Sequence, residues 1–222
     1  MYRLELIIAL LIGAVFMCAL LSIQMKWYKI ARWKSVIVSL AIVVTGLIGA
    51  KILFFIENGY WKGRSFYGAI FFSPIVFYII AKIIQISYLY ALDFCATAGC
   101  LIFGILKIQC LIDGCCEGVI LYIDKDYRYV RFPSQLVEFL SAFLLVGILM
   151  VLSYRPRFRG RIYPITLIMY GTVRFVLNLF RNDWERTQKL NLPLPWGNIW
   201  SLVAIIVGII WLIVVKKKSK SK

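Results

Sequence analysis

The chain has 222 residues, of which 62% are hydrophobic, and it carries a formal net charge of +16 at pH 7. A soluble domain is about 45–50% apolar. The excess here lies in long runs, so the composition excludes an ordinary soluble globular protein. The chain contains no histidine. This removes the commonest general base and the commonest metal ligand, and we expect neither a metal nor a cofactor.

About seven apolar runs are long enough to cross a bilayer, which takes about 17–25 residues. In chain order they are 6–23, 36–56, 66–84, 88–108, 135–153, 163–180 and 199–215. The third is interrupted by Pro74. The first follows Glu5 and lacks a small-residue cleavage site, so we expect a retained helix and not a removed signal peptide. The sequence predicts an all-α integral membrane protein with residues 1–222 as a single transmembrane domain.

The basic residues divide the connecting segments into two sets. More than half of them lie in segments 26–34 and 155–161, at Lys82 and in the tail 216–222, and this set holds no acidic residue. By the positive-inside rule it faces the cytoplasm, which puts the N-terminus outside, the C-terminus inside and a basic cytoplasmic tail at 216–222. Because the basic residues flank apolar runs, we expect anionic lipid and not nucleic acid as their partner. Asp93, near the cytoplasmic face, is expected to pair with Lys82 or with lipid headgroups.

Polar residues gather at the opposite, outer face. Tyr67 opens the third run as an interfacial aromatic residue and would face the other polar residues of that leaflet. Lys107 ends the fourth run, and the loop 109–118 follows it. In this loop Gly114 and Gly118 bracket a Cys-Cys-Glu sequence, which indicates a tight turn close to a ligand or a neighbouring helix.

The same loop holds three of the chain's six cysteines. Without histidine and without a second paired-cysteine motif, the pattern gives little support for zinc. A disulfide is compatible with the outer face of the membrane. Adjacent cysteines are poorly placed to bond each other, so the expected pair is Cys110 with Cys115 or with Cys116.

The fifth run begins with Pro-Ser-Gln-Leu-Val-Glu at residues 133–138. Ser134 is placed either to cap this helix or to contribute to a binding site, together with Gln135. Glu138 lies within the apolar run, where an ionised group costs about 3 kcal/mol or more and therefore needs a reason.

The sixth run contains a buried arginine in the middle of a polar stripe. Tyr170, Arg174, Asn178 and Arg181 are spaced by four, four and three residues, so they share one helix face. Guanidinium groups bind phosphate with two parallel hydrogen bonds, so this stripe could hold a phospholipid headgroup. Alternatively, Arg174 pairs with Glu138 and only locks two helices together.

Several segments together resemble the prolipoprotein diacylglyceryl transferases. The similar segments, in chain order, are 106–118, 133–138, 170–174 with 180–181, and Gly-Asn-Ile-Trp-Ser at 197–201. The resemblance implies seven helices in the bacterial plasma membrane, with the active face outside the cytoplasm. It also implies transfer of the diacylglyceryl group of phosphatidylglycerol to the thiol of a lipobox cysteine in a precursor protein, with release of glycerol phosphate.

The resemblance further implies roles for individual residues. Arg174 and Lys107 would hold the phosphate, and Tyr67 or Glu138 would accept the proton of the thiol. The remaining residues would bind substrate; these are Tyr170, Asn178, Arg181, Cys110, Asp113, Gly114, Gly118, Ser134 and Gln135.

The chain departs from the family pattern at five of these positions. Lys107 stands for an arginine, Cys110 and Asp113 for asparagines, Asn178 for a carboxylate and Tyr67 for a histidine. These departures leave two other functions open. One is a non-catalytic homologue that binds anionic lipid or a lipoprotein precursor. The other is a small transporter, which predicts polar residues through the full depth of the membrane.

Overall fold

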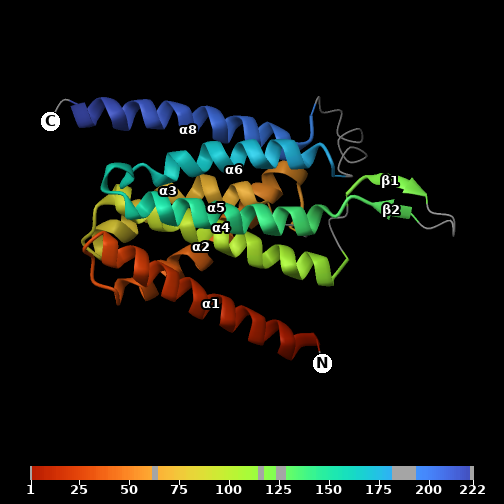
Figure 1. Cartoon of the computed structure of the whole chain (residues 1–222), viewed down its shortest axis with the longest axis horizontal. Coiled ribbons are helices and arrows are strands. Elements are labelled where there is room, and N and C mark those ends of the chain that lie inside the picture. The colour runs from red at the N-terminus through yellow and green to blue at the C-terminus, as the bar shows by residue number, and fades with distance from the viewer. Residues whose placement is uncertain (1, 62–64, 115–117, 124–128, 182–193, 221–222) are drawn as a thin grey trace. The chain divides into compact units, whose positions relative to one another are not determined.

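A computed structural model describes residues 2–61, 65–114, 118–123, 129–181 and 194–220, with the side chains of residues 2–11 and 218–220 left out (Figure 1). The described part contains seven long helices and one hairpin. The helices are α1 (Tyr2–Trp27), α2 (Lys34–Asn58), α3 (Phe66–Ile83), α4 (Tyr88–Ile112), α5 (Ser134–Tyr154), α6 (Ile162–Asn178) and α8 (Trp196–Lys220). A short 3-10 helix covers Pro156–Phe158, and the hairpin pairs β1 (Ile120–Ile123) with β2 (Tyr129–Arg131).

Each predicted apolar run overlaps one of these helices, so the prediction of an all-α membrane protein is confirmed. Five helices in the described part are long and apolar enough to cross a membrane: α2, α3, α4, α5 and the Trp196–Lys217 part of α8. The apolar part of α1, Ile12–Trp27, is shorter, and α6 has 17 residues with a polar stripe. The orientation stays a prediction. The basic tail continues α8 as far as Lys220.

The helices form two compact units, which we describe separately. The first contains residues Met1–Ile102 and Val146–Tyr163, and the second contains Phe103–Leu145 and Pro164–Lys222. The helices α4, α5 and α6 each contribute to both. The single transmembrane domain over residues 1–222 stays a prediction.

In the first unit, α3 continues through the proline that interrupts its apolar run. Pro74 lacks an N–H, so the carbonyl of Ile70 loses its usual helical donor. That carbonyl instead accepts hydrogen bonds from the hydroxyl groups of Tyr163, at 2.7 Å, and Ser73, at 2.7 Å. Because the freed carbonyl is satisfied inside the protein, the helix can remain intact in a lipid environment.

The close packing of α2 against α3 depends on two glycines. A Cβ atom at Gly68 would lie 2.0 Å from the carbonyl oxygen of Gly49, and one at Gly49 would lie 2.7 Å from the carbonyl oxygen of Gly68. The two backbones therefore touch, as small residues allow between membrane helices. This contact fixes the start of α3, where the ring of Tyr67 is buried.

A buried carboxylate joins α4 to the segment that leads into α6. Asp93 accepts a hydrogen bond from the hydroxyl of Tyr28 at 2.8 Å. Its carboxylate also accepts backbone N–H bonds from Gly160 and from Ile162, the latter at 2.9 Å. The expected pairing with Lys82 or lipid headgroups is therefore wrong. Sequence reasoning missed these partners because they are backbone groups and a tyrosine far away in the chain.

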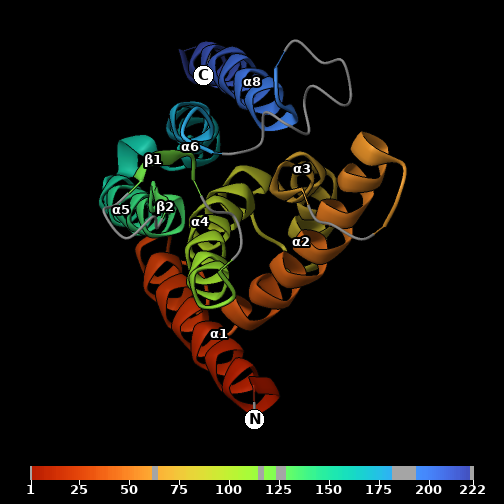
Figure 2. The same cartoon turned by 90° about the vertical axis from the view of Figure 1, so that its right-hand side faces the viewer.

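In the second unit, α6 and α8 lie side by side (Figure 1 and Figure 2). A Cβ atom at Gly171 would lie 2.9 Å from the carbonyl oxygen of Ser201, and one at Gly208 would lie 2.9 Å from that of Pro164. Glycine at these two positions lets the backbones of α6 and α8 pack closely at two points. This packing fixes the rotation of α6 and so the direction of its polar face.

The hairpin β1–β2 replaces part of what the sequence indicated as a loop, and it extends beyond the C-terminal end of α6 (Figure 1). Its base is tied to that end, because the N–H of Val119 donates to the carbonyl of Phe180 at 3.0 Å and Gly118 forms a bridge with Arg181. A Cβ atom at Gly118 would lie 2.4 Å from the carbonyl oxygen of Phe132, so this close approach requires glycine.

Candidate functional site

The centre of the second unit is a carboxylate with three cationic partners. Glu138, on the second turn of α5, is 1% exposed. Its Oε1 lies 2.6 Å from Nη1 of Arg174 on α6 and 3.1 Å from Nη1 of Arg181, just after α6. Its Oε2 contacts the ammonium group of Lys107, near the end of α4. Four residues from three separate stretches of chain thus meet at one carboxylate.

Among the described residues, the cluster holds more positive than negative charge. Lys107 and Arg181, which are buried, and Arg174, which is largely buried, all contact the one carboxylate of Glu138, although burying charge is costly unless the charge is matched. An anion that binds beside the cluster would balance the remaining charge. Guanidinium and ammonium groups both bind phosphate, so a phosphate group suits the excess by its charge and by its hydrogen-bond acceptors.

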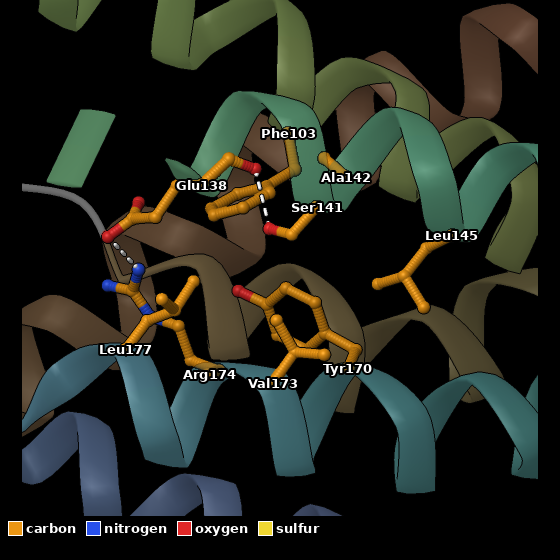
Figure 3. A pocket seen from close by; sticks show the side chains of 9 residues that line it. All are labelled: Phe103, Glu138, Ser141, Ala142, Leu145, Tyr170, Val173, Arg174 and Leu177. Atoms are coloured by element: carbon orange, nitrogen blue, oxygen red, sulfur yellow. Dashed lines mark hydrogen bonds and ion pairs between the residues drawn. The ribbon is translucent and has the colours of Figure 1, made fainter. Parts of the chain in front are cut away.

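A pocket lies beside the cluster, and Figure 3 shows its lining. The nine lining residues come from α4, α5 and α6: Phe103, Glu138, Ser141, Ala142, Leu145, Tyr170, Val173, Arg174 and Leu177. Its empty volume is about 210 Å³, part of which is open to the outside. One end is polar, with Glu138 and Arg174, and the rest is mostly apolar. The lining therefore brings a charged group and apolar side chains together.

The structure shows the pairing of Arg174 with Glu138, and the binding of a headgroup by Arg174 stays a prediction. The arginine does pair with Glu138 and so joins α6 to α5. It also lines a pocket, together with Tyr170 one turn earlier on the same face (Figure 3). The pairing alone therefore does not account for the site, because two other cations already meet the same carboxylate.

Asn178 takes a different place from Tyr170 and Arg174, which share its helix face and line the pocket. It is buried, but it is absent from the residues that line the pocket. Its Nδ2 atom lies 2.6 Å from where a Cβ atom at Gly197 would stand, so the amide packs against the first turn of α8. In this chain Asn178 contacts α8 and not the pocket.

The residues expected in the loop after α4 are more exposed. Asp113 and Gly114 are both exposed, and Asp113 accepts a hydrogen bond from Gln109 at 2.8 Å. Gly114 has a φ of 62°, which agrees with the predicted tight turn. Cys110 is half-buried. The disulfide stays a prediction, because Cys115 and Cys116 lie outside the described residues.

At the other end of the loop, Ser134 and Gln135 are buried at the start of α5. Both stand less than two turns before Glu138, and neither is among the residues that line the pocket. Tyr67 belongs to the first unit, where it stacks on Phe71 with 6.0 Å between ring centroids. Its role as a proton acceptor therefore stays a prediction.

Six of the nine residues that line the pocket were not named in the sequence analysis, and two of them stand close to the charged cluster. Phe103 stands four residues before Lys107 on α4, and Ser141 stands three residues after Glu138 on α5, where its hydroxyl donates to the Glu138 carbonyl at 2.9 Å. Spacings of three and four place residues on the same helix face. Their spacing from the charged residues Lys107 and Glu138 could therefore have predicted that Phe103 and Ser141 lie near the cluster.

Comparisons with known proteins point to one family. The family model of prolipoprotein diacylglyceryl transferase matches residues 1–214. A protein of Idiomarina loihiensis named phosphatidylglycerol–prolipoprotein diacylglyceryl transferase is 31% identical over 175 residues, which cover 75% of this chain and 64% of that protein. A protein of the same name from Ehrlichia ruminantium is 30% identical, over 75% of this chain and 74% of that protein. Another, from Clostridium tetani, is 24% identical, over 75% of each chain.

The family match covers nearly the whole chain and includes all four members of the charged cluster. The matched range also includes the parts of α5 and α6, around Glu138 and Arg174, that line the pocket. This multi-pass membrane protein belongs to the prolipoprotein diacylglyceryl transferase family.

Proposed function

We propose that the protein transfers the diacylglyceryl group of phosphatidylglycerol to the thiol of a lipobox cysteine in a precursor protein. The observation that carries the proposal is the buried Glu138 carboxylate with three cations, beside a pocket that is polar at one end and apolar elsewhere. The excess charge suits the phosphate of the lipid, and the apolar walls suit the carbon atoms next to it.

In the proposed reaction, the sulfur forms a bond to the glycerol carbon that carries the phosphate ester. The bond between that carbon and the ester oxygen breaks, and glycerol phosphate leaves with the electron pair. Arg174, Lys107 and Arg181 stabilise the charge that develops on the departing phosphate, an effect that is large in a site shielded from water. The proton of the thiol passes to a base, for which Tyr67 and Glu138 are the predicted candidates.

The geometry favours one role for Glu138 over the other. Both of its carboxylate oxygens contact cations, so a proton on Glu138 would weaken its attraction to all three. As an ion it holds the three cations close together, which a lipid phosphate could then use without large rearrangement. We therefore assign Glu138 to the positioning of the cations.

The proposed partners are phosphatidylglycerol and a precursor protein with a lipobox. The proposed location is the bacterial plasma membrane, with the site open to the extracytoplasmic leaflet. The charge asymmetry of the loops supports this orientation, because the segments with basic and no acidic residues alternate along the chain with those that hold acidic residues, such as the loop after Lys107.

A second function is favoured by one specific observation. Asn178 stands where the family resemblance implies a carboxylate, and its amide packs against α8 outside the pocket lining. A homologue that binds anionic lipid without transferring it would tolerate this change, since binding needs the cations alone.

The test uses purified full-length protein in vesicles that contain phosphatidylglycerol, with a synthetic lipobox peptide. We expect release of glycerol phosphate that is lost in Arg174→Ala and is retained in Lys51→Ala, which removes an exposed cation of α2 outside the cluster. Lipid binding without release would favour the non-catalytic homologue. Absence of both binding and release would overturn both functions.

A further inference from the structure

We propose that Phe103 is a positioning residue whose aromatic face holds two of the cluster's cations beside the pocket. The inference rests on the proposed function only in taking a lipid phosphate as the ligand of those cations. It adds an uncharged residue to the charged cluster. Phe103 acts through Lys107 and Arg174.

The geometry places the ring against both cations at once. Its centroid lies 5.2 Å from Nζ of Lys107 and 5.8 Å from Cζ of Arg174. Both distances lie within the range of about 6 Å over which a cation is attracted to the negative face of an aromatic ring. Phe103 is only 6% exposed, so water weakens this attraction little.

The ring is itself held in place. Tyr170 meets it edge to face, with 5.3 Å between centroids and 85° between the planes. This is a preferred arrangement for aromatic pairs. Phe103 and Tyr170 both line the pocket, so the ring stands between the apolar walls and the charged end (Figure 3).

The chemical need for the ring follows from the charges. Lys107 and Arg174 repel each other, and Glu138 offsets this repulsion while also pairing with Arg181. A phosphate that enters the site competes with Glu138 for the same donors. The ring attracts both cations without using their hydrogen bonds, so it keeps them near each other while their N–H groups are exchanged between carboxylate and phosphate.

A series of fluorinated phenylalanines tests this inference. Each added fluorine weakens the negative face of the ring and hardly changes its shape. We expect the apparent affinity of the full-length protein for phosphatidylglycerol in vesicles to fall stepwise with one, two and three fluorines at residue 103. A desolvated cation–π contact predicts a total loss of about two- to thirty-fold. Phe103→Leu, which has no aromatic face, should show a loss at least as large as the trifluoro variant.

The matched control is the same series at Phe139 on α5. This ring packs against Phe143 at 4.7 Å, and in the described part of the chain no cation lies over it. We expect affinity there to change little along the series. Thermal unfolding of each variant, measured in the same vesicles, should show that the substituted proteins are folded.

The outcomes separate this inference from the proposed function. A stepwise loss of lipid affinity at residue 103 supports the inference even if no glycerol phosphate is released, in which case the transferase proposal alone fails. A flat series at residue 103 in a protein that transfers normally overturns the inference and leaves the transferase proposal standing. Equal losses at residues 103 and 139 overturn it as well, because they indicate a general effect of packing.

Discussion

The protein contains two buried carboxylates that are satisfied in opposite ways. Asp93, in the first unit, accepts hydrogen bonds from a tyrosine hydroxyl and from backbone N–H groups. Glu138, in the second unit, contacts three cations. The donors to Asp93 are all neutral groups. The cations around Glu138 outnumber its single negative charge. Of the two arrangements, this one is therefore the better suited to bind an anion.

The largest expected effect comes from removing the charge of Glu138. Glu138→Gln leaves three cations together with no counter-charge, and breaking a buried ion pair costs about 3–5 kcal/mol. We expect a loss of stability of that order, measured by denaturant unfolding in detergent micelles. Added phosphatidylglycerol should restore more stability to this variant than to the unaltered protein. Equal stabilisation of both proteins would contradict an anion site at the cluster.

The corresponding change in the other unit should be smaller and should not depend on lipid. Asp93→Asn replaces one acceptor oxygen by an amide that cannot accept from an N–H group, and an unsatisfied buried group costs about 1–3 kcal/mol. We expect the same unfolding measurement to show a loss of that size, with unchanged transfer activity per folded molecule. A specific loss of activity in the folded fraction would show that Asp93 has more than a structural role.

A milder change at the cluster keeps its charge and alters its geometry. Arg174→Lys retains one cation but loses the planar fork that binds phosphate with two hydrogen bonds. We expect kcat/KM for glycerol phosphate release to fall about tenfold or more, with little change in stability. If Arg174→Lys were as active as the unaltered protein, the positive charge at this position would be sufficient for activity, and the planar guanidinium would not be needed.

The smallest expected effect comes from removing one of the two hydroxyl groups that donate to the carbonyl of Ile70 in the first unit. Tyr163→Phe removes the hydroxyl that donates to the carbonyl of Ile70, one turn before Pro74. The loss should be about 0.5–1.5 kcal/mol, because the hydroxyl of Ser73 still reaches that carbonyl. Thermal unfolding of Tyr163→Phe, Ser73→Ala and the double variant would check this. A double variant no less stable than either single one would contradict the shared role.

The predictions that held rest on patterns local in the chain. Runs of apolar residues predicted the helices, since each run is long enough to satisfy its own backbone hydrogen bonds in lipid. The spacing of Tyr170 and Arg174 predicted their shared helix face, and both line the pocket. Glu138 was identified because a charge inside an apolar run needs a partner. Arg174 was already named as a candidate for that partner.

The errors and omissions concern partners from distant parts of the chain. The sequence suggested Lys82 for Asp93, yet the actual donors belong to Tyr28 and to backbone groups around residue 160. Asn178 shares a helix face with Arg174 by spacing, but it packs against α8 because Gly197 leaves room for its amide. The hairpin after α4 was not predicted, because its strands are short and its base is held by the end of α6.

By itself, the sequence determined that the chain is a multi-pass membrane protein, because the hydrophobic effect and the hydrogen-bonding needs of the backbone act on each apolar run separately. It also determined which residues could bear charge inside the membrane. Only the tertiary structure decided that Lys107, Arg174 and Arg181 all meet Glu138, and that Phe103 faces two of them. Those contacts depend on how α4, α5 and α6 pack, and Coulomb attraction between buried charges is strong only at the short distances that packing sets.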